Sequence, residues 1–189
     1  MNEQLTPQDW IDLALTTLAH EGFGALKADS LARKLGISRG SFYWHFTDLR
    51  TFHARVISHW KQTATEAIIA DIERYASPDE RVLALLRHAF GGGGSLEVRM
   101  RTWAESNAEA ARAVSDIDRR RREYIEGLLV EAGVESSLAA TRAQLLYWTY
   151  LGAALSGSRL AGQRLDRILT ELKHVALGRV SREPTAFPG

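Results

Sequence analysis

The most informative part of the sequence runs from Ser30 to Phe46 and reads SLARKLGISRGSFYWHF. Near the start of this stretch, apolar residues recur at helical spacing, at Ala28, Leu31, Ala32 and Leu35. They predict a short amphipathic helix that ends at Gly36. After the turn, Ser38 can cap a second short helix, in which Phe42 and Phe46 share one face. Two short helices separated by a glycine-containing turn have the spacing of a helix-turn-helix.

The second helix of this pair carries the residues that are suited to reading DNA. In a helix-turn-helix, its N-terminal residues face base edges in the major groove. We expect Phe42 and Phe46 to anchor this helix to the core, so that the other side chains project outward. Arg39 can donate a bidentate pair to guanine or bind a phosphate. Gly40 lets the backbone approach DNA closely, and Ser41 can donate or accept a hydrogen bond.

Three large residues follow, and they have two possible roles. Tyr43, Trp44 and His45 place polar tips on large bodies, which suits contacts with phosphate and sugar. Alternatively, the aromatic residues of this helix complete a small hydrophobic core. We expect the core role for Phe42 and Phe46 and the contact role for Tyr43 and Trp44, because an exposed aromatic run is costly to leave in water.

Residues 21–60 resemble the DNA-binding domain of the TetR family of transcriptional regulators, and the stretch from Gly36 to Phe46 is close to that family's signature. The resemblance implies an all-α homodimer of about nine helices. It implies an N-terminal three-helix DNA-binding domain and a C-terminal ligand-sensing and dimerisation domain, to which we assign residues 1–50 and 51–180. Pro184 and Pro188 predict a flexible tail over 181–189. The resemblance also implies DNA contacts at these positions: Arg39, Gly40, Ser41, Tyr43, Trp44 and His45.

Three positions depart from the family pattern. Lys27 stands where a small hydroxyl residue usually caps the second helix, and Asp29 stands where a basic residue is common. Leu49 replaces a lysine that often opens the fourth helix, with Arg50 next to it. We therefore expect the phosphate contacts either to be weaker or to shift onto Lys27, Arg50 and His53, and we add Ser38 at the turn to the predicted DNA interface.

Helical spacing continues through the rest of the chain, and no convincing alternating strand is present. Thr6 and Pro7 predict a helix start, and Gly22 its end. Thr47 is predicted to cap a long helix reaching about Tyr75, inside which the domain boundary falls. Further helices are predicted from residue 78 to about 90, 96–104, 108 to about 132, 135 to about 158 and 165–176, with a four-glycine break at residues 91–94.

Composition sets the broad class. The chain has 189 residues, 45% of them hydrophobic, with 24 Lys and Arg against 23 Asp and Glu. A formal net charge of +1 gives no global signal for nucleic acid, so DNA affinity must come from locally placed groups. There is no cysteine, no apolar signal segment at the N-terminus and no run of 18 apolar residues. We therefore expect a cytoplasmic protein that does not interact with membranes.

The C-terminal part offers candidates for an effector site and a dimer interface. Large aromatic residues with a few polar tips suit a small apolar ligand, and the predicted ligand-binding residues are His88, Met100, Trp103, Tyr147 and Trp148. The alternative is that each belongs to the core. The arginine run at residues 119–122 favours an ion-paired helix, or one buried arginine facing a cavity. Four small residues predict the close approach of a second helix, either across a dimer interface or within the chain: Gly152, Ala153, Ser156 and Gly157.

Other classes of function have weaker support. The glycines at 91–94 lack the lysine and hydroxyl residue of a phosphate-binding loop, and the six histidines form no metal-binding pair around a glutamate. We therefore expect no enzyme activity and no cofactor. A ligand carrier that has lost DNA binding remains open because of Asp29 and Leu49. The favoured hypothesis is a repressor whose dimer binds a palindromic operator and is released by a small molecule, with the fourth helix as the lever.

Overall fold

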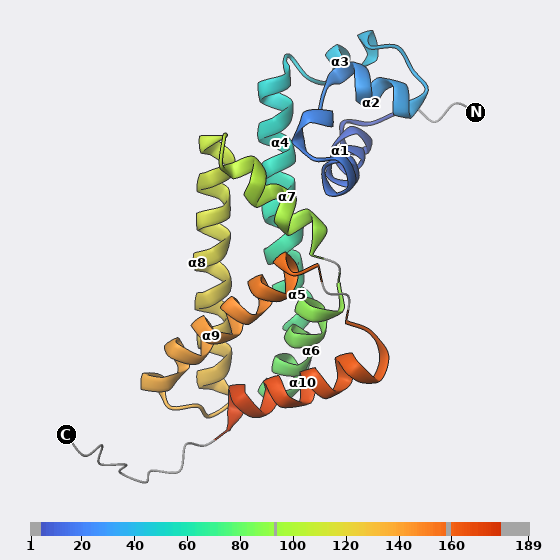
Figure 1. Cartoon of the computed structure of the whole chain (residues 1–189). Coiled ribbons are helices and arrows are strands. Elements are labelled where there is room, and N and C mark those ends of the chain that lie inside the picture. The colour runs from blue at the N-terminus through green and yellow to red at the C-terminus, as the bar shows by residue number, and fades with distance from the viewer. Residues whose placement is uncertain (1–4, 93, 158–159, 179–189) are drawn as a thin grey trace, which may run out of the picture.

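The computed structural model describes residues 5–92, 94–157 and 160–178, and within these ranges the fold is helical without any strand. Figure 1 shows a small N-terminal head on an elongated body. The elements, in chain order, are α1 (Pro7–Glu21), η1 (Phe23–Ala25), α2 (Ala28–Leu35), α3 (Gly40–His45), α4 (Leu49–Lys61), η2 (Gln62–Glu66), α5 (Ala67–Ile72), α6 (Pro78–Gly91), α7 (Ser95–Ala104), α8 (Ala108–Glu131), α9 (Ser136–Leu155) and α10 (Gly162–Leu177). The predicted all-α class is confirmed, and the tail predicted over 181–189 lies outside the described residues.

Capping side chains explain where two of the helices begin. At the start of α1, the Asp9 carboxylate accepts the Thr6 N–H at 2.6 Å, and the Thr6 hydroxyl accepts the Asp9 N–H at 3.4 Å. Ser77 and Glu80 form the same reciprocal pair before α6. Each pair satisfies backbone donors that have no partner inside the helix. Proline follows the cap directly in both cases, where its missing N–H costs nothing.

The predicted long helix from Thr47 to Tyr75 needs correction at both ends. Asp48 is the cap, because its extended backbone lets its carboxylate accept the Thr51 N–H at 2.7 Å, and this hydrogen bond lowers the pKa of Asp48. The run α4–η2–α5 continues without a break and ends at Ile72. Its middle, η2, is a five-residue π-helical segment that the sequence did not reveal.

Two further boundaries differ from the prediction. Arg39 occupies the position before α3 and no side chain caps that helix, so the expected Ser38 cap is wrong. Helix α9 ends at Leu155, before the predicted end near residue 158. The predicted stop at Gly36 is confirmed: its φ of 70° lies in the left-handed region, which glycine adopts without strain.

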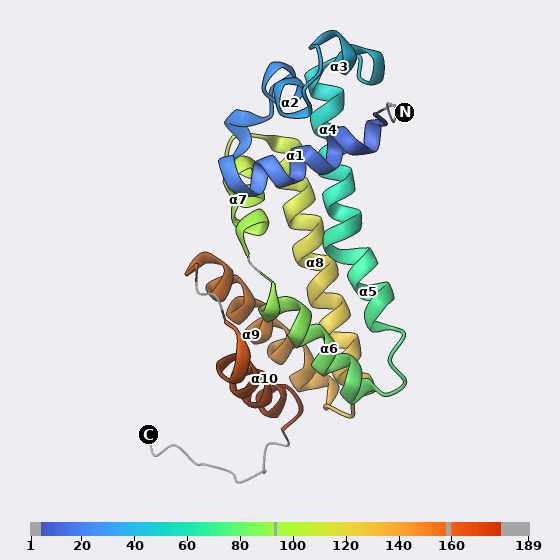
Figure 2. The same cartoon turned by 90° about the vertical axis from the view of Figure 1, so that its right-hand side faces the viewer.

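Two hydrophobic clusters form the core. The first joins the head to the body, because Trp10 and Phe42 of the head share it with Met100 and Trp103 of α7. The second lies further down the body and includes Leu86, Phe90, Leu128, Leu146 and Tyr147. Figure 2 shows α4 and α8 descending together from the head toward this second cluster. No helix of the described segments is long and apolar enough to cross a membrane.

Candidate DNA interface and effector cavity

Helix α3 is fixed to the head by one aromatic face. Phe42 and Phe46 are buried, as predicted. The Phe42 ring meets the edge of Trp10 at 5.3 Å and of Phe52 at 5.1 Å between ring centroids. Contacts of this geometry add to the free energy of burial. The remaining face of α3 is therefore held in a defined orientation.

The opposite face of α3 is open to solvent. Trp44 is 88% exposed and Tyr43 is 45% exposed, so neither completes a core. His45 is half-buried and its ring meets Phe46 edge-on. The other predicted DNA-interface residues are also exposed or half-buried: Lys27, Ser38, Arg39, Gly40, Ser41 and Arg50. An indole this exposed is unusual for a folded protein and marks a surface suited to a partner.

His53, the third residue of the expected phosphate grip, has another role. It is half-buried, and its Nε2–H donates to the Leu26 carbonyl at 3.0 Å. The ring also meets Phe23 and Trp103 edge-on. His53 therefore helps to join the head to the body.

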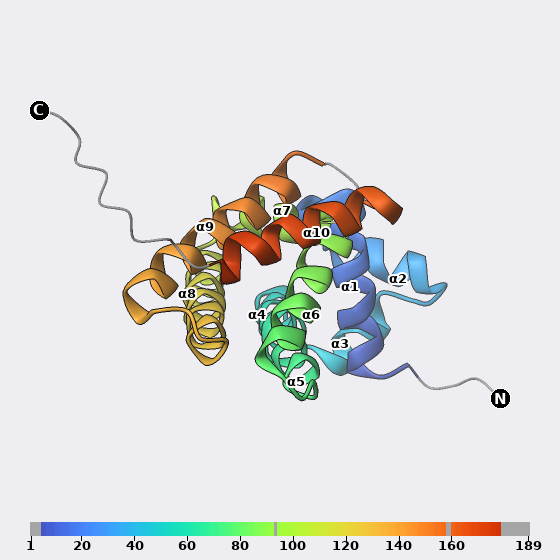
Figure 3. The ribbon, with the colours of Figure 1, turned by 90° about the horizontal axis from the view of Figure 1, so that it is seen from below.

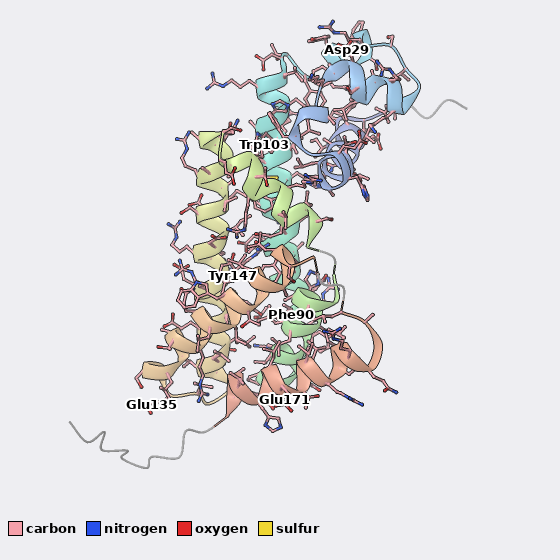
Figure 4. The ribbon with its side chains drawn as sticks, viewed as in Figure 1. Asp29, Phe90, Trp103, Glu135, Tyr147 and Glu171 are labelled. Atoms are coloured by element: carbon pink, nitrogen blue, oxygen red, sulfur yellow. The ribbon has the colours of Figure 1, made fainter. Side chains whose placement is uncertain are left out.

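Arg39 is held by two neighbours that lie on different helices. Its Nη2 donates to the Tyr43 hydroxyl at 3.1 Å, and its Nε lies 3.4 Å from the Asp29 carboxylate of α2. The hydrogen bond to Tyr43 and the nearby carboxylate raise the pKa of Arg39. Asp29, the acidic departure in α2, thus pairs with the arginine expected to read DNA. Figure 4 shows Asp29 at the outer end of the head.

A cavity of about 350 Å³ lies in the body, bordered by the α4–α5 run and by α6, α7, α8 and α9. Most of its wall is apolar, and the principal apolar residues are Trp60, Ile68, Ile69, Leu86, Phe90 and Leu146. Small-molecule sites in proteins are mostly apolar with a few polar groups. Among the polar residues of this wall, Glu97, Arg121 and Tyr150 lie together.

Glu97 is the hub of this polar cluster, and its side chain is only 5% exposed. One carboxylate oxygen accepts from Arg101 at 2.9 Å. The other accepts from Arg121 at 2.9 Å and from the Tyr150 hydroxyl at 3.2 Å. The Arg121 Nη2 also donates to the Ala64 carbonyl in η2 at 2.9 Å. A buried carboxylate needs such partners, because burial of an unpaired charge is strongly unfavourable.

Asp118 of α8 extends the cluster behind the cavity wall. Arg101 binds both of its carboxylate oxygens, at 3.1 and 2.5 Å, and the Tyr147 hydroxyl donates to it at 2.6 Å. Burial is the main reason why the pKa of Tyr150 rises to about 12 and that of Tyr147 rises as well. Both tyrosines therefore keep their protons near neutral pH and act as donors to these carboxylates.

The predicted ligand-binding residues separate in space. His88 and Tyr147 line the cavity, with His88 exposed at its rim. Met100 and Trp103 do not, because their face of α7 packs into the first core cluster, next to the head. Trp148 is 61% exposed on α9 and also lies outside the cavity wall. Figure 4 shows Trp103 next to the head, well apart from Tyr147 and Phe90 in the body.

Sequence reasoning missed Glu97 as a cavity residue and did not single out Arg121 within the arginine run. Of the two interpretations of the arginine run, ion pairing holds for Arg119 and Arg120, and burial beside a cavity holds for Arg121. A signal was present, because Arg121 lies four residues after Ile117 and four before Ile125, both of which are buried. A charged residue at a core position of a helix indicates a buried ion pair.

Helix α7 also contacts the head. Trp103, six residues after Glu97, is 1% exposed and stacks on Phe23 of η1, with ring centroids 4.5 Å apart and planes 19° apart. It meets His53 of α4 edge-on at 5.5 Å. One ten-residue helix therefore contacts both the cavity cluster and the head.

Comparison with known proteins agrees with the head geometry. A family model described as bacterial regulatory proteins, tetR family, matches residues 11–48, which include α2 and α3. Residues 11–48 are therefore similar to the N-terminal region of that family. A search of curated proteins finds no significant match.

Solved structures of TetR-like regulators share the whole fold. The TetR transcriptional regulator of Legionella pneumophila is 17% identical with a TM-score of 0.68, over 93% of this chain and 97% of that one. The reduced form of NemR from E. coli is 18% identical with a TM-score of 0.74, over 89% and 96%. FadR of Bacillus subtilis, crystallised with stearoyl-CoA, is 16% identical with a TM-score of 0.65, over 93% and 100%. At this identity the likeness establishes the fold alone.

Proposed function

We propose that this protein is a ligand-responsive transcriptional regulator, a repressor whose dimer binds a palindromic operator through α3 and is released by a small molecule in the body. The observation that carries the proposal is the open face of α3, with Trp44 88% exposed beside Arg39 and Tyr43 in a TetR-family domain. The second helix of such a motif enters the major groove.

DNA binding is tested by a mobility shift with the duplex upstream of the protein's own gene, or with duplexes selected from a random library. Arg39→Ala and Tyr43→Ala should each weaken binding about tenfold, because each removes a base or phosphate contact worth about 1–3 kcal/mol. Arg74→Ala is the matched control, since Arg74 is an exposed arginine at the other end of the protein, paired with Asp71. Unchanged affinity in both head variants would refute the proposed interface.

The dimer is proposed to form through α9 and α10. Exposed apolar side chains on these helices support it: Leu145, Trp148, Leu155 and Val175. The small residues predicted for this contact, Gly152 and Ala153, lie on the same helix. Figure 3 shows α9 and α10 side by side along one face of the body, where a second copy can pack against both. Exposed apolar patches of this kind mark protein–protein contacts.

Coupling between cavity and DNA is proposed to act through helices that contact both. The α4–η2–α5 run begins beside α3, where Phe52 packs on Phe42, and it reaches the cavity at Trp60. A ligand shifts DNA affinity only if it binds the two states of the protein differently. Unchanged operator affinity at a saturating concentration of a ligand that fills the cavity would refute the coupling.

A further inference from the structure

The walls and volume of the cavity limit the size and polarity of an effector. At about 350 Å³ it stands at the small end of the range for ligand sites, roughly 300–1,000 Å³. Aromatic and aliphatic side chains form most of the wall, among them Trp60, Phe90 and Ile125. A compact molecule with one or two rings, or a short chain, matches this space.

The polar end of the cavity is electrically balanced. Two arginines, Arg101 and Arg121, face two carboxylates, Glu97 and Asp118, so the formal charge of the cluster is zero. Each carboxylate has at least two donors within 3.2 Å. The cluster therefore holds no uncompensated charge that a charged ligand could neutralise.

Binding of either a cation or an anion at this cluster is unfavourable. A cation would find Glu97 already paired, and the face of the Tyr150 ring covered by the Arg121 guanidinium at 5.5 Å. An anion that accepts from Arg121 would lie beside the buried carboxylate of Glu97 and would share one guanidinium charge with it. Either ion would lose its hydration without gaining a free counter-charge, which is strongly unfavourable.

The cluster can still hold a hydrogen-bond acceptor. The tyrosine hydroxyls already donate to the carboxylates. Arg121 carries five N–H donors, and its hydrogen bonds to Glu97 and to the Ala64 carbonyl engage two of them. Next to Ala64, Thr65 is one of the residues that line the cavity, and its buried hydroxyl has no hydrogen-bond partner among the described residues.

We propose that the cavity selects a small, uncharged, mostly apolar molecule whose hydrogen-bond acceptor is bound by Arg121, and that the Glu97–Arg121 ion pair excludes charged compounds of the same shape. This inference rests on the proposed function, of which it specifies the effector class. Glu97 and Arg121 are thereby assigned as the residues that set specificity.

The experiment uses three compounds that share one ring system, titrated into the full-length protein by calorimetry: 1-acetylnaphthalene, 1-naphthoate and 1-naphthylmethylammonium. The neutral ketone should bind at least about tenfold more tightly than either ion, a difference of about 1.4 kcal/mol. Glu97→Gln leaves the cluster with one excess positive charge and should shift the preference about tenfold toward naphthoate. Arg121→Met removes the proposed donor and should weaken binding of the ketone. It also leaves one excess negative charge, so the preference should shift toward the ammonium compound.

Arg119→Met is the matched control, because Arg119 lies two residues earlier on α8, is 61% exposed and pairs with Asp116 outside the cavity wall. It should leave the order of the three affinities unchanged. The assignment would be overturned if either ion bound the wild-type protein more tightly than the ketone does, or if no compound bound at all. It would also be overturned if folded Glu97→Gln kept the same order of affinities. The order of the three affinities in the wild-type protein tests the proposal even if a variant fails to fold. The DNA mobility shift without ligand tests the proposed function separately.

Discussion

Asp29 is expected to restrain the affinity of the head for DNA, so Asp29→Asn should bind DNA more tightly. The Asp29–Arg39 pair spans 3.4 Å between side chains that are each 59% exposed, and such a solvent-exposed pair contributes little to stability. The substitution should therefore leave the fold intact. It frees the Arg39 guanidinium for phosphate and removes a negative charge from the face that approaches DNA.

The size of the effect follows from charge interactions in water. Two unit charges about 4 Å apart interact by about 1 kcal/mol, which is roughly fivefold in affinity for each head. Two heads of a dimer give roughly 25-fold for an unrelated duplex. Each freed arginine that binds one phosphate should steepen the slope of log K against log salt by about 0.9. Affinity for the operator should rise less than affinity for unrelated DNA. The reason is that Arg39 is then held by Tyr43 alone and is less well positioned for a specific contact.

The assay is a mobility shift on operator and unrelated duplexes at several salt concentrations. Asp71→Asn is the control, because Asp71 forms an exposed pair of the same kind with Arg74, 3.3 Å apart, on α5. If Asp29→Asn bound unrelated DNA no more tightly than Asp71→Asn did, the restraining role of Asp29 would be refuted.

Three other perturbations test different parts of the molecule. Burial lowers the pKa of His53 below its ordinary value of 6.5, against an opposing hydrogen bond to a backbone carbonyl, so the unfolded state binds more protons. The free energy of unfolding in urea should therefore decrease as pH falls through 6.5, and His53→Gln should reduce this dependence. Arg121→Met should destabilise the fold by roughly 2–4 kcal/mol in urea, because it removes one partner of buried Glu97, whereas Arg119→Met should cost less than about 0.5 kcal/mol. Trp148→Glu should convert the dimer to a monomer in sedimentation experiments, and an unchanged mass would exclude this face as the interface.

The head could be predicted from sequence because its determinants are local. The stop at Gly36 depends on backbone freedom at one residue, and the burial of Phe42 and Phe46 follows from a spacing of four. The start of α4 could not be placed, because Thr47 and Asp48 are both good caps. The extended backbone at Asp48 selects between them, and this depends on the turn after α3.

The cavity was harder to predict because it depends on which helices meet in space. Met100 and Trp103 have the spacing of a buried face, but the sequence does not tell whether that face meets the head or the ligand site. Trp148 lies on a helix whose apolar and polar residues do not separate into two faces, so periodicity cannot distinguish its inner side from its outer side. The position of Arg121 on the inner face of α8 could have been predicted, since it lies four residues after the buried Ile117.

The sequence led to the hypothesis that the fourth helix alone transmits ligand binding to the head, and the proposed regulation extends this role to a second helix. Two helices join the cavity to the head: the α4–α5 run through Trp60, and α7 through Glu97 and Trp103. Glu97 and Trp103 belong to one rigid helix, and packed interiors do not deform continuously. We infer that a ligand bound to Arg121 changes the hold of Arg121 on Glu97, and that this change passes along α7 to the stack of Trp103 on Phe23. The differential affinity that regulation requires can therefore originate at the Glu97–Arg121 pair, with α7 and α4 as joint levers.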